Sequence, residues 1–136
     1  MKAIQFHQHG GTDVLVYEEV PTPKPGSNEV LIRVRAASIN HLDIWVRNGT
    51  PTFPIPLPHI LGSDASGLVE EIGEGVTGHK PGDPVVISPG LSCFQCQACL
   101  SGDDNLCDHY SICGAGSKGT YAEFAVVPAR NLVSKP

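Results

Sequence analysis

The sequence predicts a mainly β fold: a small, mostly antiparallel barrel with one short helix and a metal-binding cysteine loop. Fifteen Gly and twelve Pro make up about a fifth of the 136 residues, compared with an average of about 12% in proteins. Such a chain turns often, so long helices are excluded. The apolar runs are short, and the clearest of them alternates with charged residues, as a strand does. Four cysteines lie between residues 93 and 107.

Composition and charge exclude several classes of protein. Hydrophobic residues make up 40% and charged residues 17% of the chain, which is typical of one globular domain and not of a disordered segment. The net charge is −5 and the four Arg are dispersed, so nucleic acid is not an expected partner. No apolar run approaches the roughly 20 residues of a membrane span, and no apolar signal core follows the N-terminus. We therefore expect a cytoplasmic protein without a membrane partner.

In the first half of the chain, strands are predicted over residues 2–6, 14–20 and 29–37. The third of these has the best strand signal, because apolar and charged side chains alternate along it. Residues 39–47 break the alternation and place apolar side chains at helical spacing, which predicts one short helix. Four prolines between residues 50 and 58 predict an extended loop.

In the second half, strands are predicted over residues 68–72, 85–88, 121–127 and 131–133. Residues 91–113 show no clean periodicity and contain all five cysteines. Closing these short strands into a barrel leaves few open sheet edges, which favours that architecture over an open sheet.

The cysteines form the pattern C-x2-C-x2-C-x7-C, with Cys93, Cys96, Cys99 and Cys107 as predicted metal ligands. Four thiolates from one short loop are typical of a tetrahedral structural zinc site. Disulfides are the first alternative, disfavoured because cytoplasmic thiols stay reduced. An iron–sulfur cluster, which also uses four cysteines, is the second. The fifth, Cys113, is predicted to be a small buried side chain.

Four segments in order resemble one known family. Residues 93–107 resemble the structural zinc lobe of the medium-chain dehydrogenase/reductases, the superfamily of zinc alcohol dehydrogenases and quinone oxidoreductases. Residues 62–69 resemble the G-x-[ED]-x-x-G-x-V segment of that family, residues 76–85 its G-D-x-V turn, and residues 119–124 its G-[GT]-[YF]-A-E-[YF] strand.

The resemblance implies that residues 1–136 are the GroES-like N-terminal domain, a partly open β-barrel with a zinc lobe at about 91–113. Chains of the family continue into a Rossmann domain that binds NAD or NADP through a Gly-rich turn. Residues 114–119 match that turn only superficially, since they do not open a plausible helix. We therefore expect the cofactor domain to be absent from this sequence and the chain alone to be inactive.

The resemblance also places the catalytic site. Zinc alcohol dehydrogenases take one catalytic ligand from a Cys where this sequence has Asn40 and another from a His where it has Ser63. An amide and a hydroxyl are poor zinc ligands. Two residues after the Cys position, Leu42 replaces a frequent proton-relay hydroxyl. We therefore expect no catalytic zinc, with Asn40 and Ser63 as donors to the developing oxyanion and Asp64 as a supporting acceptor.

Two histidines lie close to these positions in the sequence. His41 matches a position that in related enzymes can face the cofactor phosphates, so it is the predicted cofactor-binding residue. His59 is expected to be a hydrogen-bonded side chain and not a metal ligand, because a lone His is no metal signature.

The predicted function is that of an NAD(P)-dependent oxidoreductase acting on a small molecule: an alcohol or carbonyl, a quinone or an enone. The full-length protein is expected to be a homo-oligomer. In having Asn40 and Ser63 in place of the catalytic Cys and His, the sequence resembles the zinc-free quinone oxidoreductase branch of the family, although that branch usually lacks the zinc lobe. The alternatives are a zinc-dependent alcohol dehydrogenase with unusual ligands and a stand-alone zinc-binding interaction module.

Overall fold

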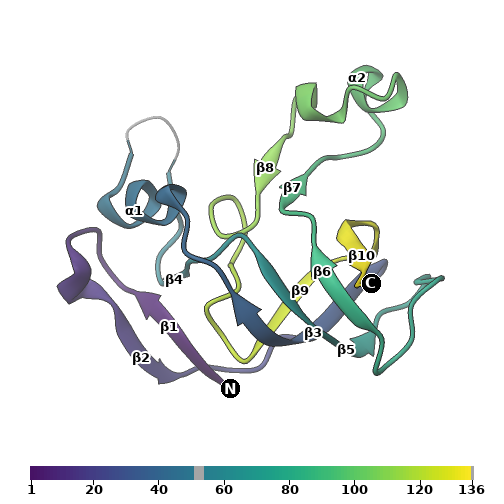
Figure 1. Cartoon of the computed structure of the whole chain (residues 1–136). Helices are drawn as coiled ribbons and strands as arrows, with labels where there is room; N and C mark the ends of the chain where they lie inside the picture. The colour runs from purple at the N-terminus through teal and green to yellow at the C-terminus, as the bar shows by residue number, and fades with distance from the viewer. Residues whose placement is uncertain (51–53, 136) are drawn as a thin grey trace.

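The computed structural model describes residues 1–50 and 54–135, and these form two main β-sheets and a projecting lobe (Figure 1). The strands are β1 (Lys2–Phe6), β2 (Val16–Glu19), β3 (Glu29–Ala37), β4 (His59–Ile60), β5 (Ala65–Ile72), β6 (Pro84–Ile87), β7 (Gly90–Leu91), β8 (Ser111–Ile112), β9 (Phe124–Pro128) and β10 (Leu132–Ser134). The helices are α1 (His41–Asn48) and α2 (Gln97–Leu100), with 3-10 turns η1 (Thr12–Val14), η2 (Asp104–Leu106) and η3 (Ala129–Asn131).

The larger sheet has five antiparallel strands in the order β10-β6-β5-β3-β9. Its central strand pair, β3 and β5, is bulged at two points, which bends the sheet. The inward face carries fully buried β-branched side chains such as Val30, Ile32 and Val127. This packing explains the alternation along residues 29–37, and the predicted strand there is confirmed to the residue.

The smaller sheet, β2-β1-β4, joins the larger one through residues 121–123. The N–H of Ile4 donates to the carbonyl of Tyr121 (2.8 Å), and the N–H of Glu123 donates to the carbonyl of Lys2 (3.0 Å). The N–H of Val34 donates to the carbonyl of Glu123 (2.9 Å), so one short segment hydrogen-bonds to both sheets. The outer strands β2 and β10 are not paired with each other among the described residues. The barrel is therefore partly open, and the predicted mainly β fold class is confirmed.

Several element boundaries differ from those predicted. Strand β2 is shorter than predicted because residues 12–14 form a 3-10 turn. Strand β5 begins three residues earlier than predicted, at Ala65, and β9 begins only at Phe124. The two-residue strand β4 is not anticipated from the sequence, since a run this short has no period. Of the predicted loop at 50–58, residues 51–53 lie outside the described residues.

The cysteine lobe, residues 91–113, extends away from the two sheets and appears at the top of Figure 1. The short antiparallel pair β7-β8 forms its base, and α2 and η2 form its tip. Beneath the lobe, a second buried cluster includes Phe6, Val46, Ile55 and Leu61 and holds α1 against the body. No helix in the described part of the chain has the length and apolar character needed to cross a membrane.

Candidate functional site

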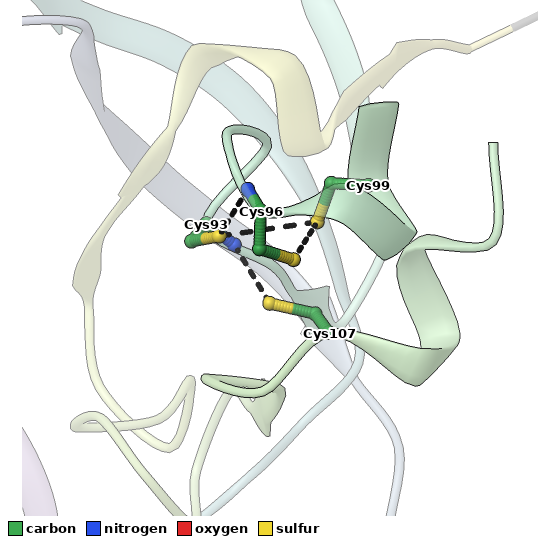
Figure 2. A group of neighbouring side chains, drawn as sticks. All are labelled: Cys93, Cys96, Cys99 and Cys107. Atoms are coloured by element: carbon green, nitrogen blue, oxygen red, sulfur yellow. Dashed lines mark hydrogen bonds between the residues drawn. The ribbon is translucent and has the colours of Figure 1, made fainter. Parts of the chain in front are cut away.

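The four predicted metal ligands lie together in the lobe, as Figure 2 shows. The sulfur atoms of Cys93, Cys96, Cys99 and Cys107 all lie within 4.8 Å of one another. Cys93 and Cys96 precede α2, Cys99 lies within it, and Cys107 directly follows η2. None of these cysteines forms a disulfide. Four sulfurs facing one point match the tetrahedral arrangement of a closed zinc site.

Backbone N–H groups point at these sulfurs. The N–H of Cys93 and the N–H of His109 each donate to the sulfur of Cys107, and the N–H of Cys96 donates to that of Cys93, all at 3.3 Å. Hydrogen bonding from the backbone, that of Cys99 first, lowers the pKa of the Cys96 thiol to about 6. Desolvation, followed by the neighbouring Cys96 sulfur, raises the pKa of Cys99 to about 12. Backbone hydrogen bonds also lower the pKa of Cys93, so the cluster favours the thiolate at Cys93 and Cys96 and opposes it at Cys99, where a cation would be needed for ionisation.

The lobe is fixed to the body at the end of the chain. The guanidinium of Arg130 lies 4.4 Å from the centre of the Phe94 ring, a cation–π contact. The Asn131 amide donates to the carbonyls of Ser88 (2.8 Å) and Gly90 (2.6 Å), where the chain enters the lobe. These contacts set the direction in which the lobe leaves the barrel.

The three predicted catalytic residues also lie together, at the N-terminus of α1. The amide nitrogen of Asn40 donates to Oδ2 of Asp64 (2.8 Å), and the hydroxyl of Ser38 donates to the same oxygen (2.9 Å). Asp64 therefore fixes the orientation of the Asn40 amide. Ser63 precedes Asp64 and is 95% buried, since its exposed fraction is 5%. The Ser63 hydroxyl has no hydrogen-bond partner among the described residues, which is unusual for a buried polar group.

Two chain segments cross tightly beside Ser63. The N–H groups of Thr120 and Tyr121 donate to the carbonyls of Gly62 and Leu61, both at 3.0 Å. Gly62 has a φ of +100°, and a Cβ there would lie 2.5 Å from the hydroxyl of Thr120. Only glycine allows this backbone conformation and approach, so Gly62 positions the serine that follows it.

A buried carboxylate ties α1 to this crossing. Asp43 accepts the N–H of Asn40 (2.7 Å), the N–H of Gly62 (3.1 Å) and the hydroxyl of Tyr121 (2.7 Å). Burial and this acceptor raise the pKa of Tyr121, so its phenol stays protonated and donates. Tyr121 is not among the site residues predicted from the sequence. The one indication of it there is the aromatic position in the family segment at residues 119–124.

Replacing Asp43 by Ala should therefore destabilise the fold strongly. The substitution removes three hydrogen bonds to a buried carboxylate, leaves the Gly62 N–H unpaired and leaves the Tyr121 hydroxyl only the carbonyl of Ser38 at 3.2 Å. A hydrogen bond to a charged group contributes about 1.5–3 kcal/mol, and three are lost, so we expect a loss of at least 3 kcal/mol in the free energy of unfolding. Urea titration measures it, and Asp83→Ala, a turn carboxylate that accepts one exposed N–H from Lys80, is the control. A loss below 1 kcal/mol for Asp43→Ala would contradict this role.

An open hollow of about 300 Å³ lies at these residues; we call it the polar hollow. It is lined by Asn40, His41, Leu42, Ser63, Asp64, Pro89 and Ile112. His41 is exposed, and its ring contacts that of Trp45 at a tilt of 52°, with centroids 4.8 Å apart. Trp45 lies on the outer face of α1, where 58% of it is exposed. The structure places His41 at the hollow, and its role toward a cofactor stays a prediction.

The remaining candidates are structural. His59 is buried, and its Nε2 lies 3.0 Å from the carbonyl of Gly114, as expected of a hydrogen-bonded histidine. Burial lowers the pKa of His59, so the ring is neutral at pH 7. Cys113 is 1% exposed within the main core, and desolvation raises its pKa to about 11. It is the small buried side chain that was predicted.

Comparison with known families now decides the assignment. The family described as "Alcohol dehydrogenase GroES-like domain" matches residues 26–136. The chain belongs to this family. The resemblance to the medium-chain dehydrogenases is thereby confirmed, and the partly open barrel and cysteine lobe are those of this GroES-like domain.

Solved structures and curated relatives agree with this assignment. A crystal structure of an NAD-dependent alcohol dehydrogenase superposes with a TM-score of 0.95 at 51% identity, over 100% of this chain and 40% of that chain. A cobalt- and zinc-bound thermostable alcohol dehydrogenase from Pyrobaculum aerophilum gives 0.92 at 45% identity, over 99% and 41%. An L-threonine 3-dehydrogenase from Pyrococcus horikoshii is 42% identical over 120 residues, 87% of this chain and 34% of the relative. The chain thus spans about two fifths or less of the length of these proteins.

Proposed function

We propose that residues 1–136 are the N-terminal domain of an NAD(P)-dependent oxidoreductase that interconverts an alcohol and its carbonyl compound. The observation that carries the proposal is the polar hollow, where Asn40, Ser63 and Asp64 meet in a domain of the alcohol dehydrogenase family. The relatives named alcohol and threonine dehydrogenases support the reaction class. These relatives are about 2.5 times as long as this chain. The Rossmann domain that binds NAD or NADP is therefore expected in the remainder of the protein.

The cysteine cluster is proposed to hold one structural zinc. Four sulfurs within 4.8 Å and three N–H donors directed at them fit a zinc with a closed coordination shell. Such a metal has no open position for substrate, so its contribution is to hold the lobe in place.

A catalytic zinc does not fit the polar hollow. Among the described residues it offers the amide of Asn40, the hydroxyl of Ser63 and the carboxylate of Asp64. The Asn40 nitrogen and the Ser38 hydroxyl already donate to one Asp64 oxygen. Among the described lining residues there is no cysteine, and the one imidazole is that of the exposed His41. This donor set favours hydrogen bonding over zinc coordination, so we propose catalysis without a metal in this hollow.

A bound nicotinamide would supply the acceptor for the hydride that leaves the carbinol carbon, and the hydroxyl proton would pass to water at the open polar hollow; reduction would take the same hydride and proton back. The Ser63 hydroxyl is buried and has no hydrogen-bond partner among the described residues. We propose that it donates a hydrogen bond to the substrate oxygen, which would then be its acceptor. Asn40 lies beside it with its amide oriented by Asp64. The same donors could polarise a quinone or a conjugated enone, which makes these the second substrate class to assay.

Ser63→Ala in the full-length protein tests this role. We expect kcat for alcohol oxidation to fall about 100-fold or more, the usual loss when one oxyanion donor is removed. Ser134→Ala, an exposed serine of β10, is the matched control and should keep the parent rate. An unchanged kcat for Ser63→Ala would contradict the role of Ser63. If the protein bound a second metal and lost its NAD(P)-dependent activity when that metal was removed, the proposal of catalysis without a metal in the hollow would be wrong.

Unpaired thiols at a metal cluster are typical of a reducing compartment. We therefore propose a cytoplasmic enzyme, and the resemblance to its family supports a homo-oligomer with a small-molecule substrate.

A further inference from the structure

An open hollow with a cationic lining lies at the end of the five-stranded sheet, and it shares no lining residue with the polar hollow. Its volume is about 560 Å³, within the roughly 300–1,000 Å³ typical of small-molecule sites. The loop between β5 and β6 forms one wall and the segment between β9 and β10 the other, both near the C-terminus marked in Figure 1. We call it the cationic hollow, and its walls include Asn28, Gly75, Thr77, His79, Ala129 and Arg130.

One residue joins the two walls of the cationic hollow. Asn28 precedes β3 and has a left-handed backbone, with a φ of 61°. Its N–H donates to the carbonyl of Glu74 (2.7 Å), and its carbonyl accepts the N–H of Ala129 (2.9 Å). Gly75 has a φ of +80°, and a Cβ there would lie 2.8 Å from Oδ1 of Asn28, so the loop approaches this closely because the residue is glycine. The hollow is therefore held by the backbone of both walls.

The polar side chains of this hollow suit an anion. Arg130 brings a guanidinium, His79 an imidazole and Thr77 a hydroxyl, whereas no described lining residue is Asp or Glu. In a chain with fourteen Asp and Glu residues and a net charge of −5, this is a local reversal of sign. The neighbouring Glu74 is exposed and takes part through its main-chain carbonyl. An anion entering here would meet a cation and several donors.

Arg130 has no anionic partner within the described chain. The salt bridges there use other cations, and the guanidinium hydrogen bonds are those of Arg33 and Arg47. The guanidinium of Arg130 instead lies 4.4 Å from the centre of the Phe94 ring. A cation–π contact holds a guanidinium in place but gives its N–H groups no oxygen acceptor. The fork of N–H donors therefore remains available to an oxyanion, which it fits with two parallel hydrogen bonds.

We propose that the cationic hollow binds a phosphate group, with Arg130 as its main ligand, and that the bound phosphate stabilises the cysteine lobe. The phosphate belongs either to free phosphate or to a phosphorylated small molecule. A phosphate dianion presents oxygens in several directions, which suits donors from two walls, whereas a carboxylate presents two oxygens in one plane. Phe94 directly follows the cluster residue Cys93, so an anion that fixes Arg130 also fixes a ring of the lobe. This inference does not depend on the proposed function.

Hydrogen exchange of the full-length protein, followed by mass spectrometry at constant ionic strength, tests the site. We expect inorganic phosphate at millimolar concentration to slow amide exchange in residues 73–80 and 128–132 and, more weakly, in 91–113. Chloride and acetate at the same ionic strength should not, because general screening depends on ionic strength alone. Tighter binding of glycerol 3-phosphate than of inorganic phosphate would identify a phosphorylated small molecule as the ligand, and the reverse order would identify free phosphate.

Matched variants locate the effect. Arg130→Gln should weaken phosphate binding about tenfold or more, because a charge-assisted contact is lost. Arg35→Gln makes the same change of charge at an exposed arginine of β3 outside the hollow, and should bind phosphate as the parent does. Since Arg130→Gln also removes the contact with Phe94, His79→Ala is the second variant. It keeps that contact, so it should weaken phosphate binding severalfold and leave the phosphate-free exchange of residues 91–113 unchanged.

Three results would overturn the binding site. These are equal protection by chloride or acetate, phosphate protection confined to other parts of the full-length protein, and phosphate protection that persists in both Arg130→Gln and His79→Ala. Phosphate protection at 73–80 and 128–132 with none at 91–113 would overturn the stabilisation of the lobe and support the binding site.

Discussion

The isolated chain of residues 1–136 should neither bind NADH or NADPH measurably nor turn over an alcohol. In the proposed enzyme this domain supplies one wall of the reaction site, and the nicotinamide is held by the remainder of the protein. A substrate placed by one wall has no oriented hydride donor, so it loses a proximity contribution of about 7–11 kcal/mol. Isothermal titration calorimetry with each nucleotide, and an alcohol oxidation assay, measure both effects.

The full-length protein is the control for this experiment and should bind one nucleotide tightly enough to measure. Micromolar binding to residues 1–136 alone would place the cofactor site within this domain and contradict the proposed division.

The isolated chain should also self-associate, because Ile39 is 85% exposed and Trp45 58% exposed on the side of α1 and the polar hollow.

Removing the metal should unfold the cysteine lobe while the five-stranded sheet survives. The lobe has no core of its own: Phe94, Leu100, Leu106 and Tyr110 are all 40% exposed or more. Structural zinc in small sites contributes about 10–16 kcal/mol of binding free energy, which is the largest single term available to this segment. We expect chelation to abolish amide-exchange protection within 91–113 and to leave that of β3 and β5 in place.

Elemental analysis of matched variants identifies the ligands. The parent chain should contain about one equivalent of zinc, and Cys107→Ala should contain none. Cys113→Ala, which changes a core cysteine outside the cluster, should keep its zinc. Unchanged lobe protection after chelation would show that the lobe does not depend on metal, and two equivalents in the parent would contradict a metal-free polar hollow.

The cysteine lobe also reaches the polar hollow. Ile112, in strand β8 at the base of the lobe, is one of the residues that line this hollow. A metal that holds the lobe in place would therefore also hold part of the proposed catalytic site.

The sequence by itself determined the parts of this domain that depend on local spacing. The strand at Glu29–Ala37 follows from the period-two placement of Val30, Ile32 and Val34, and the cysteine cluster follows from four ligands within one short loop. Gly and Pro content excluded long helices, and the motif order predicted the family that residues 26–136 match. Periodicity and short spacings are properties of neighbouring residues, so no distant contact is needed to interpret them.

Only the tertiary structure decided how distant residues meet. Asp64 accepts from Asn40, 24 residues away, and Asp43 accepts from Tyr121, 78 residues away. The unpartnered state of Ser63 and the closeness of Tyr110 to Leu42 likewise depend on how the sheets and the lobe pack. A short strand such as β4 and a boundary such as the start of β9 exist because another segment pairs there. Pairing across the chain is set by global packing, which no local pattern records.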